Sequence, residues 1–257
     1  MISIFKEMCK PMVKNNRINI IDEVRGALII LVVVYHILYD SAVIFKVKEL
    51  WAAYRTAHIL QPFLPFMFIL ISGIAFKLSR DNIKRGLFLG AVALAVTAAT
   101  RLFIPQYTVV FGILHFLALM HILFGIIQRL IKEIPAKIWI VICALCAVLF
   151  VLTYNIQLGY FGIEGLFTAP LPDALYQSNA LMVFGFHTID FVSADYNPIL
   201  PWIFIFVIGI FIGRYIQKLP ESLKKPHIRP LAFVGRHTLI IYLAHQPIIY
   251  GILWLIC

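Results

Sequence analysis

The stretch "RGALIILVVVYHILYD", residues 25–40, places three ionisable side chains in a run that is otherwise almost entirely apolar. Arg25 opens it, uncharged residues fill 26–35, and His36 and Asp40 follow. Such a run is typical of a membrane-spanning helix, where ionisable groups are costly and usually mark a site or a pathway. From 25 to 36 a helix makes about three turns and rises about 16.5 Å. We therefore predict Arg25 and His36 on one face, with Asp40 one turn beyond.

The whole chain has the composition of an integral membrane protein. Its 257 residues are 62% hydrophobic and 13% charged, whereas soluble domains are about 45–50% apolar and about 25% charged. The net charge of +10 is not arranged as a basic stretch with interleaved aromatic residues, so no nucleic-acid partner is expected. Zinc-protease, P-loop, paired CxxC and serine-hydrolase motifs are missing from the sequence, and no metal is expected.

The apolar runs predict an all-α polytopic membrane helix bundle of about seven spans, forming a single domain over residues 1–257. The expected spans are 26–45, 60–78, 86–104, 109–127, 138–157, 199–217 and 233–256. The long connection 158–198 holds an apolar piece too short to span. It is expected either to re-enter the membrane over a cavity or to lie on the surface as an amphipathic segment.

Lysine and arginine concentrate in segments that alternate correctly to share one side of the membrane: the N-terminus, 77–85, 129–137 and 214–236. That side is cytoplasmic by the positive-inside rule, so the N-terminus is expected inside and the C-terminus outside. The first seventeen residues lack the separate apolar core and cleavage site of a signal peptide, so the first span is expected to be the anchor.

The stripe on the first span suits a transfer between two compartments. A neutral His36 has the chemistry of a general base, and Asp40 one turn away has that of an orienting partner. Arg25 at the cytoplasmic end is suited to a phosphate-bearing donor. The alternatives are that Arg25 snorkels as a topology anchor and that His36 and Asp40 form a satisfied structural pair.

Other polar side chains recur inside apolar sequence. His115, Asp195 and His245 come from different spans and are all expected in the outer half, which predicts a common polar cavity. Taken singly, each is also explained as a structural residue. Ser72 and Gly73 in "LISGIAF" fit either a binding role or close helix packing.

Five stretches carry a resemblance to a known family: "INIIDEVRGALIILVVVYHILYD", "FMFILISGIAFKLSR", "GILHFLA", "DYNPILPWIFIFVIGIFIG" and "GRHTLIIYLAHQPI". Over nearly the whole chain, and in matching order, the sequence resembles bacterial relatives of heparan-alpha-glucosaminide N-acetyltransferase. More distantly it resembles the acyltransferase-3 family, whose Arg-to-His spacing in the first span implies Arg25 and His36 as the matching positions.

The resemblance implies a bacterial cytoplasmic-membrane enzyme that moves an acetyl or other acyl group from cytoplasmic acyl-coenzyme A to an extracytoplasmic sugar or glycan, by O- or N-acylation. Donor contacts are expected at Arg25, Arg80, Arg236, Ser72 and Gly73. Catalytic residues are expected at His36, Asp40, His115, Asp195 and His245. Direct transfer with His36 as base is the first hypothesis, and an acyl-histidine relay is the second.

This sequence departs from the animal enzyme in two respects. It is much shorter, and it has no clean match to that enzyme's functional histidine in the outer loop after the first span, although His58 lies in the corresponding region.

The expected partners are acyl-coenzyme A, a carbohydrate or glycolipid acceptor and the lipid bilayer, with a homodimer left open. Two other functions compete with acyl transfer. A small proton-coupled transporter would use the same histidines and acids as a relay, although the sequence lacks paired inverted halves. A non-enzymatic accessory subunit would use its polar residues only to join helices.

Overall fold

The computed structural model describes residues 18–130, 134–216 and 218–256 and confirms the all-α polytopic architecture. In these residues six helices are long and apolar enough to cross a membrane, or seven if Lys48–His58 and Phe63–Phe76 together make one broken span. The described residues form two compact parts, considered separately below: the first part comprises those up to 64 and from 215 onward, and the second those between 65 and 214. The single-domain expectation stays a prediction.

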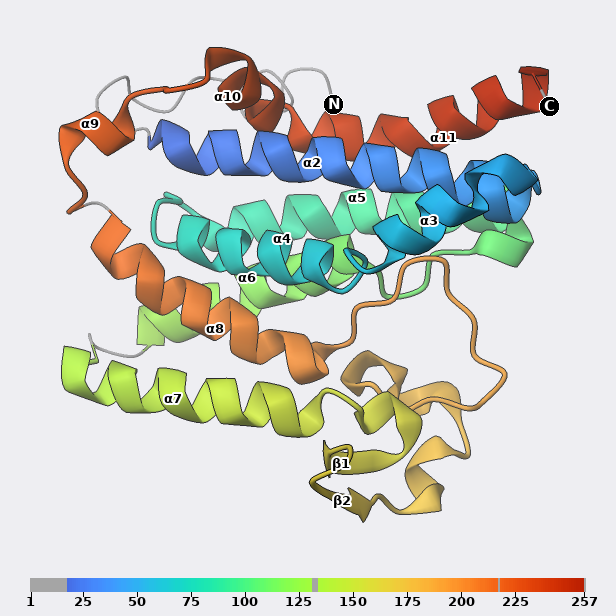
Figure 1. The fold of residues 1–257 in the computed structure, drawn as a ribbon. Helices are drawn as coiled ribbons and strands as arrows, with labels where there is room; N and C mark the ends of the chain where they lie inside the picture. The colour runs from blue at the N-terminus through green and yellow to red at the C-terminus, as the bar shows by residue number, and fades with distance from the viewer. Residues whose placement is uncertain (1–17, 131–133, 217, 257) are drawn as a thin grey trace. The chain divides into compact units, whose positions relative to one another are not determined.

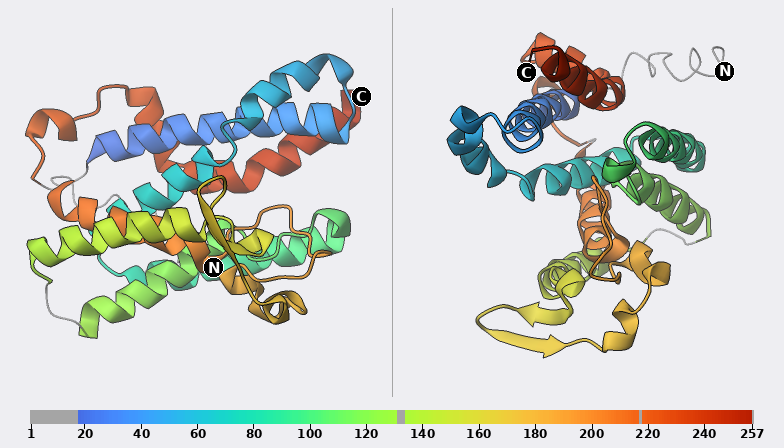
Figure 2. Two further views of the ribbon diagram at one scale, coloured as in Figure 1. Left: turned by 60° about the horizontal axis from the view of Figure 1, so that its bottom comes forward. Right: turned by 90° about the vertical axis from the view of Figure 1, so that its right-hand side faces the viewer.

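The first part is organised around α2 (Asn19–Tyr39), which continues into a π-helical turn, η1 (Asp40–Ile44). The 3₁₀ turn η2 (Lys48–Leu50) and helix α3 (Trp51–His58) return the chain along the C-terminal end of α2. After α9 (Glu221–Lys224) and α10 (Arg229–Arg236), the last helix α11 (Thr238–Ile256) lies beside α2 (Figures 1 and 2). The two ends of the sequence therefore build one helical unit.

Helix α2 begins earlier than the predicted start at residue 26. Its first two turns hold Asp22 and Glu23, both buried, which the hydrophobic pattern assigns to the aqueous flank. They are accommodated because α10 packs against them. The predicted span 233–256 is likewise divided, since α10 ends at Arg236 and α11 starts at Thr238. A span search by hydropathy merges α10 with α11, because it does not detect a change of helix direction.

Two glycines allow α2 and α10 to approach at backbone distance. A Cβ atom at Gly26 would overlap the backbone carbonyl of Leu231, and one at Gly235 would overlap the carbonyl oxygen of Asp22. Small residues serve this purpose in membrane helices, where close backbone contact replaces the hydrophobic driving force.

The second part contains most of α4 (Phe63–Phe76) and α8 (Ile199–Ile216), together with α5 (Asn82–Phe103), η3 (Pro105–Tyr107), α6 (Ile113–Leu130) and α7 (Ala136–Thr153). Asp81 caps α5 by accepting a hydrogen bond from the Lys84 amide. The core lies among α4, α6 and α8 and is formed by buried apolar residues: Ile69, Phe76, Phe116, Met120, Trp202, Ile205, Phe206 and Ile210.

The connection 158–198 contains no α-helix, although both sequence-based alternatives were framed around an apolar or amphipathic segment. It follows the turn η4 (Ile156–Leu158) and forms an antiparallel hairpin, β1 (Tyr160–Ile163) and β2 (Phe167–Pro170), with Tyr160 opposite Pro170. Two 3₁₀ helices follow, η5 (Asp173–Tyr176) and η6 (Asn179–Phe184). Two strands of four residues each, one of them interrupted by Gly162, are too short to give a usable periodicity, so the hydrophobic pattern does not predict them.

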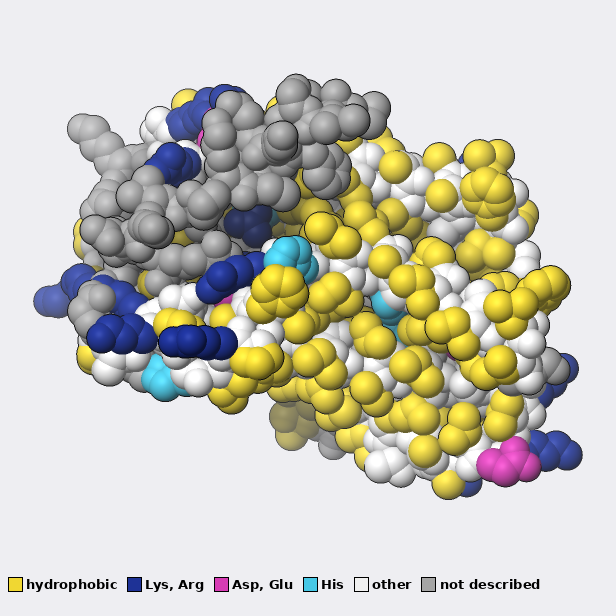
Figure 3. Space-filling view, turned by 90° about the horizontal axis from the view of Figure 1, so that it is seen from above, with side chains coloured by type: hydrophobic (Ala, Val, Ile, Leu, Met, Phe, Trp, Pro, Cys, Tyr) yellow, Lys and Arg dark blue, Asp and Glu magenta, His cyan; other side chains and the backbone are white. Residues whose placement is uncertain are grey.

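The face of the molecule drawn in Figure 3 has basic side chains at one end and a broad apolar area over α11. Figure 3 shows Lys and Arg side chains gathered toward α9 and α10, and hydrophobic side chains covering α11. Exposed apolar residues on α11 include Ile240, Ile248, Ile252 and Trp254. A helix that exposes such residues is matched to lipid rather than to water.

Candidate active site

Arg25, His36 and Asp40 all lie on the α2–η1 element, as the spacing predicts. The α-helix is continuous from Asn19 to Tyr39, and the ladder widens to π geometry at Asp40, where the Phe45 amide donates to the Asp40 carbonyl at 2.9 Å. Single π-helical turns are rare and occur frequently at functional sites. Here the turn begins at Asp40, which is 1% exposed and more buried than Asp22 or Glu23.

His36 meets a second histidine from the other end of the chain. Its ring centroid lies 4.9 Å from that of His245 on α11, which is itself buried. His245 Nδ1 lies 2.6 Å from the carbonyl oxygen of Tyr242. Because a carbonyl oxygen only accepts, Nδ1 must carry a proton. In the neutral ring Nε2 is then unprotonated and can accept a hydrogen bond or a proton through its lone pair.

Asp40 is also joined to α11. Its carboxylate is hydrogen-bonded by the side chain of Gln246, the residue after His245. The predicted partner of Asp40 was His36, but His36 Nδ1 and Asp40 Oδ1 are both buried without a hydrogen-bond partner in the described structure. Each of these α2–η1 side chains therefore finds its neighbour on α11. Gln246 was not among the residues predicted from the sequence, although an amide inside the apolar run "IIYLAHQPIIY" is itself an indication of a polar site.

The four side chains His36, Asp40, His245 and Gln246 form what we call the α2–α11 polar cluster. Each has one buried polar atom without a hydrogen-bond partner: His36 Nδ1, Asp40 Oδ1, His245 Nε2 and Gln246 Oε1. A buried polar atom left unsatisfied costs about 1–3 kcal/mol, so native structures contain few of them. Four in one place, on two apolar helices, indicate a binding site for a polar group.

Tyr35, the neighbour of His36, links the cluster to α3. Its hydroxyl group lies 3.1 Å from His58 Nδ1, and His58 is exposed. Tyr39 and Tyr54 complete an aromatic group around Tyr35, with ring centroids 6.3 Å from it in each case. The fold therefore brings His58 to the outer flank of the α2 stripe, although it is separate from the buried cluster.

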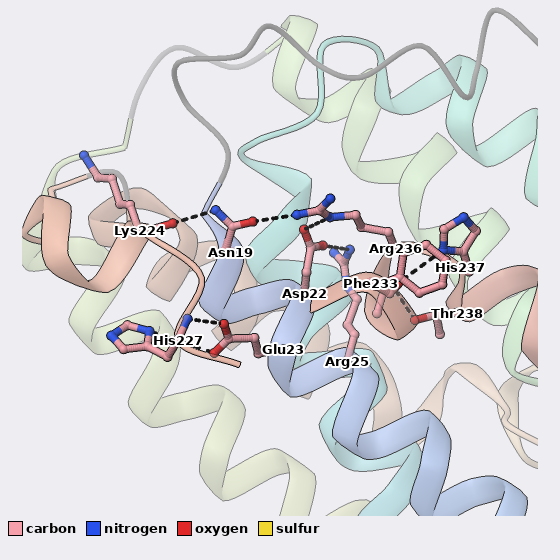
Figure 4. Close-up of polar contacts among 11 residues, drawn as sticks. Asn19, Asp22, Glu23, Arg25, Lys224, His227, Phe233, Arg236, His237 and Thr238 are labelled. Carbon is pink, nitrogen blue, oxygen red and sulfur yellow. Dashed lines mark hydrogen bonds and ion pairs between the residues drawn. The ribbon is translucent and has the colours of Figure 1, made fainter. Parts of the chain in front are cut away.

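At the other end of α2, Asp22 holds two arginines (Figure 4). Asp22 is buried, and its carboxylate oxygens lie 3.5 Å from Arg25 and 3.9 Å from Arg236 of α10. Arg236 also donates to Asn19 Oδ1 at 3.0 Å. Two guanidinium groups, from α2 and α10, thus lie at one buried carboxylate at this end of α2.

Glu23 fastens the same end of the first part. Its Oε1 atom accepts from the amides of His227 and Ile228, at 2.6 and 2.9 Å, immediately before α10 begins at Arg229. Two orphan amides at a helix start are satisfied by a buried carboxylate from a distant segment. This contact fixes α10, and with it Arg236, against α2.

The remaining predicted residues lie in the second part. His115 Nε2 is 3.2 Å from the Thr97 hydroxyl. Asp195 Oδ2 accepts from the amide of Ile113 at 2.9 Å and so caps α6. Ser72 contacts the buried His121 at 3.2 Å, and Gly73 packs against the backbone of Phe206 and Gly209. Arg80 is exposed.

The structure therefore brings together Arg25 with Arg236, and His36 with Asp40 and His245. It gives structural tasks to Asp195 and Gly73, in line with the packing alternative for Gly73. The common cavity that we expected to include His115 and Asp195 stays a prediction, as do the donor contacts of Arg80, Ser72 and Gly73.

Comparison with protein families gives a match that covers most of the chain. The model for heparan-alpha-glucosaminide N-acetyltransferase, catalytic, matches residues 17–247. The chain belongs to this family. The resemblance noted from the sequence is thus confirmed, and membership makes the protein a membrane acetyltransferase. Neither the curated proteins nor the solved structures gave a match.

The acetyltransferase match contains every residue of the α2–α11 polar cluster. It also contains Asp22 and the residues that surround it, Asn19, Arg25 and Arg236. The two polar groups occupy the two ends of one helix, α2, whose residues 25 to 40 rise about 22 Å at about 1.5 Å per residue. An acetyltransferase of this family needs a donor site and an acceptor site. The first part supplies two polar groups, one near each end of α2, that could serve these two purposes.

Proposed function

We propose that the protein transfers an acetyl or other acyl group from cytoplasmic acyl-coenzyme A to the hydroxyl or amine of a sugar or glycolipid on the opposite side of a bacterial cytoplasmic membrane. The observation that carries the proposal is the α2–α11 polar cluster, with four unsatisfied polar atoms buried on two apolar helices. It supports chemistry where the end of α2 meets α11, between a donor from one side and an acceptor from the other.

Arg25 and Arg236 are proposed to bind the phosphates of the donor. Guanidinium groups form bidentate hydrogen bonds with phosphate oxygens. Asp22 and Asn19 already orient both of them, so little side-chain freedom is lost when an anion binds. Arg80, which is exposed in the second part, stays a candidate donor contact.

Transfer is proposed to be direct, at the His36–His245 pair. The acceptor loses a proton to an imidazole as it bonds to the acyl carbon, and coenzyme A leaves as its thiol. His115 and Asp195 stay candidate catalytic residues of the second part, where they contact Thr97 and the Ile113 amide. Covalent capture of the acyl group by a histidine is the route that this proposal replaces, and it would appear as radiolabel retained on denatured protein.

Donor binding and transfer provide the primary test. Acetyl-coenzyme A should raise the apparent melting temperature of the purified full-length protein, since a ligand that binds only the native state stabilises it. Radiolabelled acetyl groups should then pass to an amino sugar. If millimolar acetyl-coenzyme A neither stabilises the protein nor donates its acetyl group, the proposal is wrong.

Arg25→Lys tests the donor site. Lysine keeps the charge but lacks the planar fork that pairs with phosphate oxygens, so the KM for acetyl-coenzyme A should rise about tenfold, with kcat nearly unchanged. Lys84→Arg, at a largely exposed side chain in the second part, serves as the control. An unchanged donor KM would reduce Arg25 to a topology anchor.

The proposed orientation has a separate test. With seven spans and a cytoplasmic N-terminus, a phosphatase reporter fused after Cys257 should be active, because that enzyme works only outside the cytoplasm. A fluorescent reporter that folds only in the cytoplasm should be dark at the same position. The reverse result would show that the span count differs from seven by an odd number.

A further inference from the structure

The two histidines of the α2–α11 polar cluster are not equivalent, so they can have different roles in the reaction. His245 is held in one tautomer by the Tyr242 carbonyl, with Nε2 deprotonated, buried and without a hydrogen-bond partner. His36 has no such contact on Nδ1, which is buried and unpartnered. A general base has to be both oriented and unprotonated before the substrate arrives, and His245 meets that description.

The other unsatisfied atoms of the cluster are acceptors. Asp40 Oδ1 and Gln246 Oε1 are both buried without a donor, and Asp40 is almost fully inaccessible. The amide N–H of Gln246 is the group that can donate to the Asp40 carboxylate. Gln246 Oε1 and Asp40 Oδ1 therefore remain as acceptors for another molecule. Together with His245 Nε2 they form three acceptor atoms in one cluster. A substrate that satisfies them presents several neighbouring N–H or O–H groups.

We infer that the His245–Gln246 pair of α11 activates and positions the acceptor: His245 is the general base, and Gln246 with Asp40 binds a donor group next to the reacting one. The inference rests on the proposed function and deepens it. His36, which the sequence favoured as the base, becomes a hydrogen-bond donor to the acyl carbonyl oxygen.

The acceptor nitrogen or oxygen forms a bond with the acyl carbon, and the carbon–sulfur bond of the thioester breaks. The proton of the acceptor passes to His245 Nε2. The departing coenzyme A thiolate takes up that proton, which leaves His245 neutral again and the acceptor acylated. No oxidant, reductant or further reactant is needed.

Substitutions at His245 separate the base role from the structural one. In His245→Asn the side-chain amide nitrogen lies near the position of Nδ1, so the bond to the Tyr242 carbonyl is retained while Nε2 is lost. With acetyl-coenzyme A and D-glucosamine as probes, kcat should fall about 100-fold or more, while stabilisation by acetyl-coenzyme A is unchanged. His245→Gln is a second variant without the base, should the first fail to fold. Ile248→Ala, on the exposed side of α11, is the matched control.

Gln246 is tested by acceptor discrimination. Wild type is expected to use D-glucosamine at least about tenfold better in kcat/KM than cyclohexylamine, which has an amine but no neighbouring hydroxyl groups. Gln246→Met should raise the KM for D-glucosamine about tenfold and leave cyclohexylamine turnover unaltered. A merely structural role would change both substrates alike.

The outcomes distinguish this inference from the proposed function. Turnover within about threefold of wild type in both His245 variants would overturn the base assignment. Equal losses on the two amines in Gln246→Met would overturn the positioning role. A wild-type protein that is stabilised by acetyl-coenzyme A but acetylates neither amine would overturn the acceptor site while the donor proposal stands. Without stabilisation or transfer to any acceptor, the proposed function itself fails.

Discussion

Gly235→Ala should destabilise the first part of the protein, although alanine is the better helix former. The new Cβ would overlap the carbonyl oxygen of Asp22, a backbone atom that is unable to swing aside as a side chain does. Overpacking costs about 1–3 kcal/mol, which corresponds to a fall of roughly 2–12 °C in apparent melting temperature for a chain of this size. The fall in apparent melting temperature is measured by thermal unfolding of the purified protein.

Gly251→Ala is the matched control for this substitution. Gly251 lies on α11 in the same part of the protein, and no atom lies within 4 Å of an added Cβ. There alanine should be neutral or stabilise by about 0.5–1 kcal/mol, through its helix propensity alone. If Gly235→Ala and Gly251→Ala unfold at the same temperature, the close contact between α2 and α10 is not a determinant of stability.

His36→Ala should abolish most acyl transfer while leaving donor binding intact. The expected loss in kcat is about 100-fold or more, because the variant loses an imidazole at the reacting atoms. Stabilisation by acetyl-coenzyme A should persist, since Arg25 is about 16.5 Å away along the helix. Asp40→Asn should do less harm, because it keeps an acceptor oxygen at the same position.

Ile37→Ala, the next residue on α2 with its side chain exposed, controls for the loss of packing. Normal turnover in His36→Ala would remove His36 from the reaction. The chemistry would then rest on His245 without His36, or would have to be sought at His58, beside Tyr35, or at His115 in the second part.

These predictions differ in how much of each follows from the sequence. The spacing of Arg25 and His36 along one helix depends on a local period, and the helix is continuous from Asn19 to Tyr39 as that spacing requires. The roles of the two residues stay predictions. The Gly235 and Gln246 predictions need the structure. Nothing near Gly235 in the sequence indicates that its neighbour is the backbone of Asp22, and nothing near Gln246 indicates Asp40.

The sequence by itself determined the all-α membrane class, the approximate spans, the family and the polar stripe of α2. These properties follow from apolar run length and helical period, which act over tens of residues. Only the tertiary structure decided which side chains meet: His36 with His245, Asp40 with Gln246, and Asp22 with Arg25 and Arg236. It also decided the hairpin of 160–170 and the break between α10 and α11. The physical reason is that a helix fixes the spacing of its own side chains, whereas the partners of those side chains depend on which distant helix packs against them. The hydrophobic pattern of a helix shows which face is apolar but not which helix will pack there.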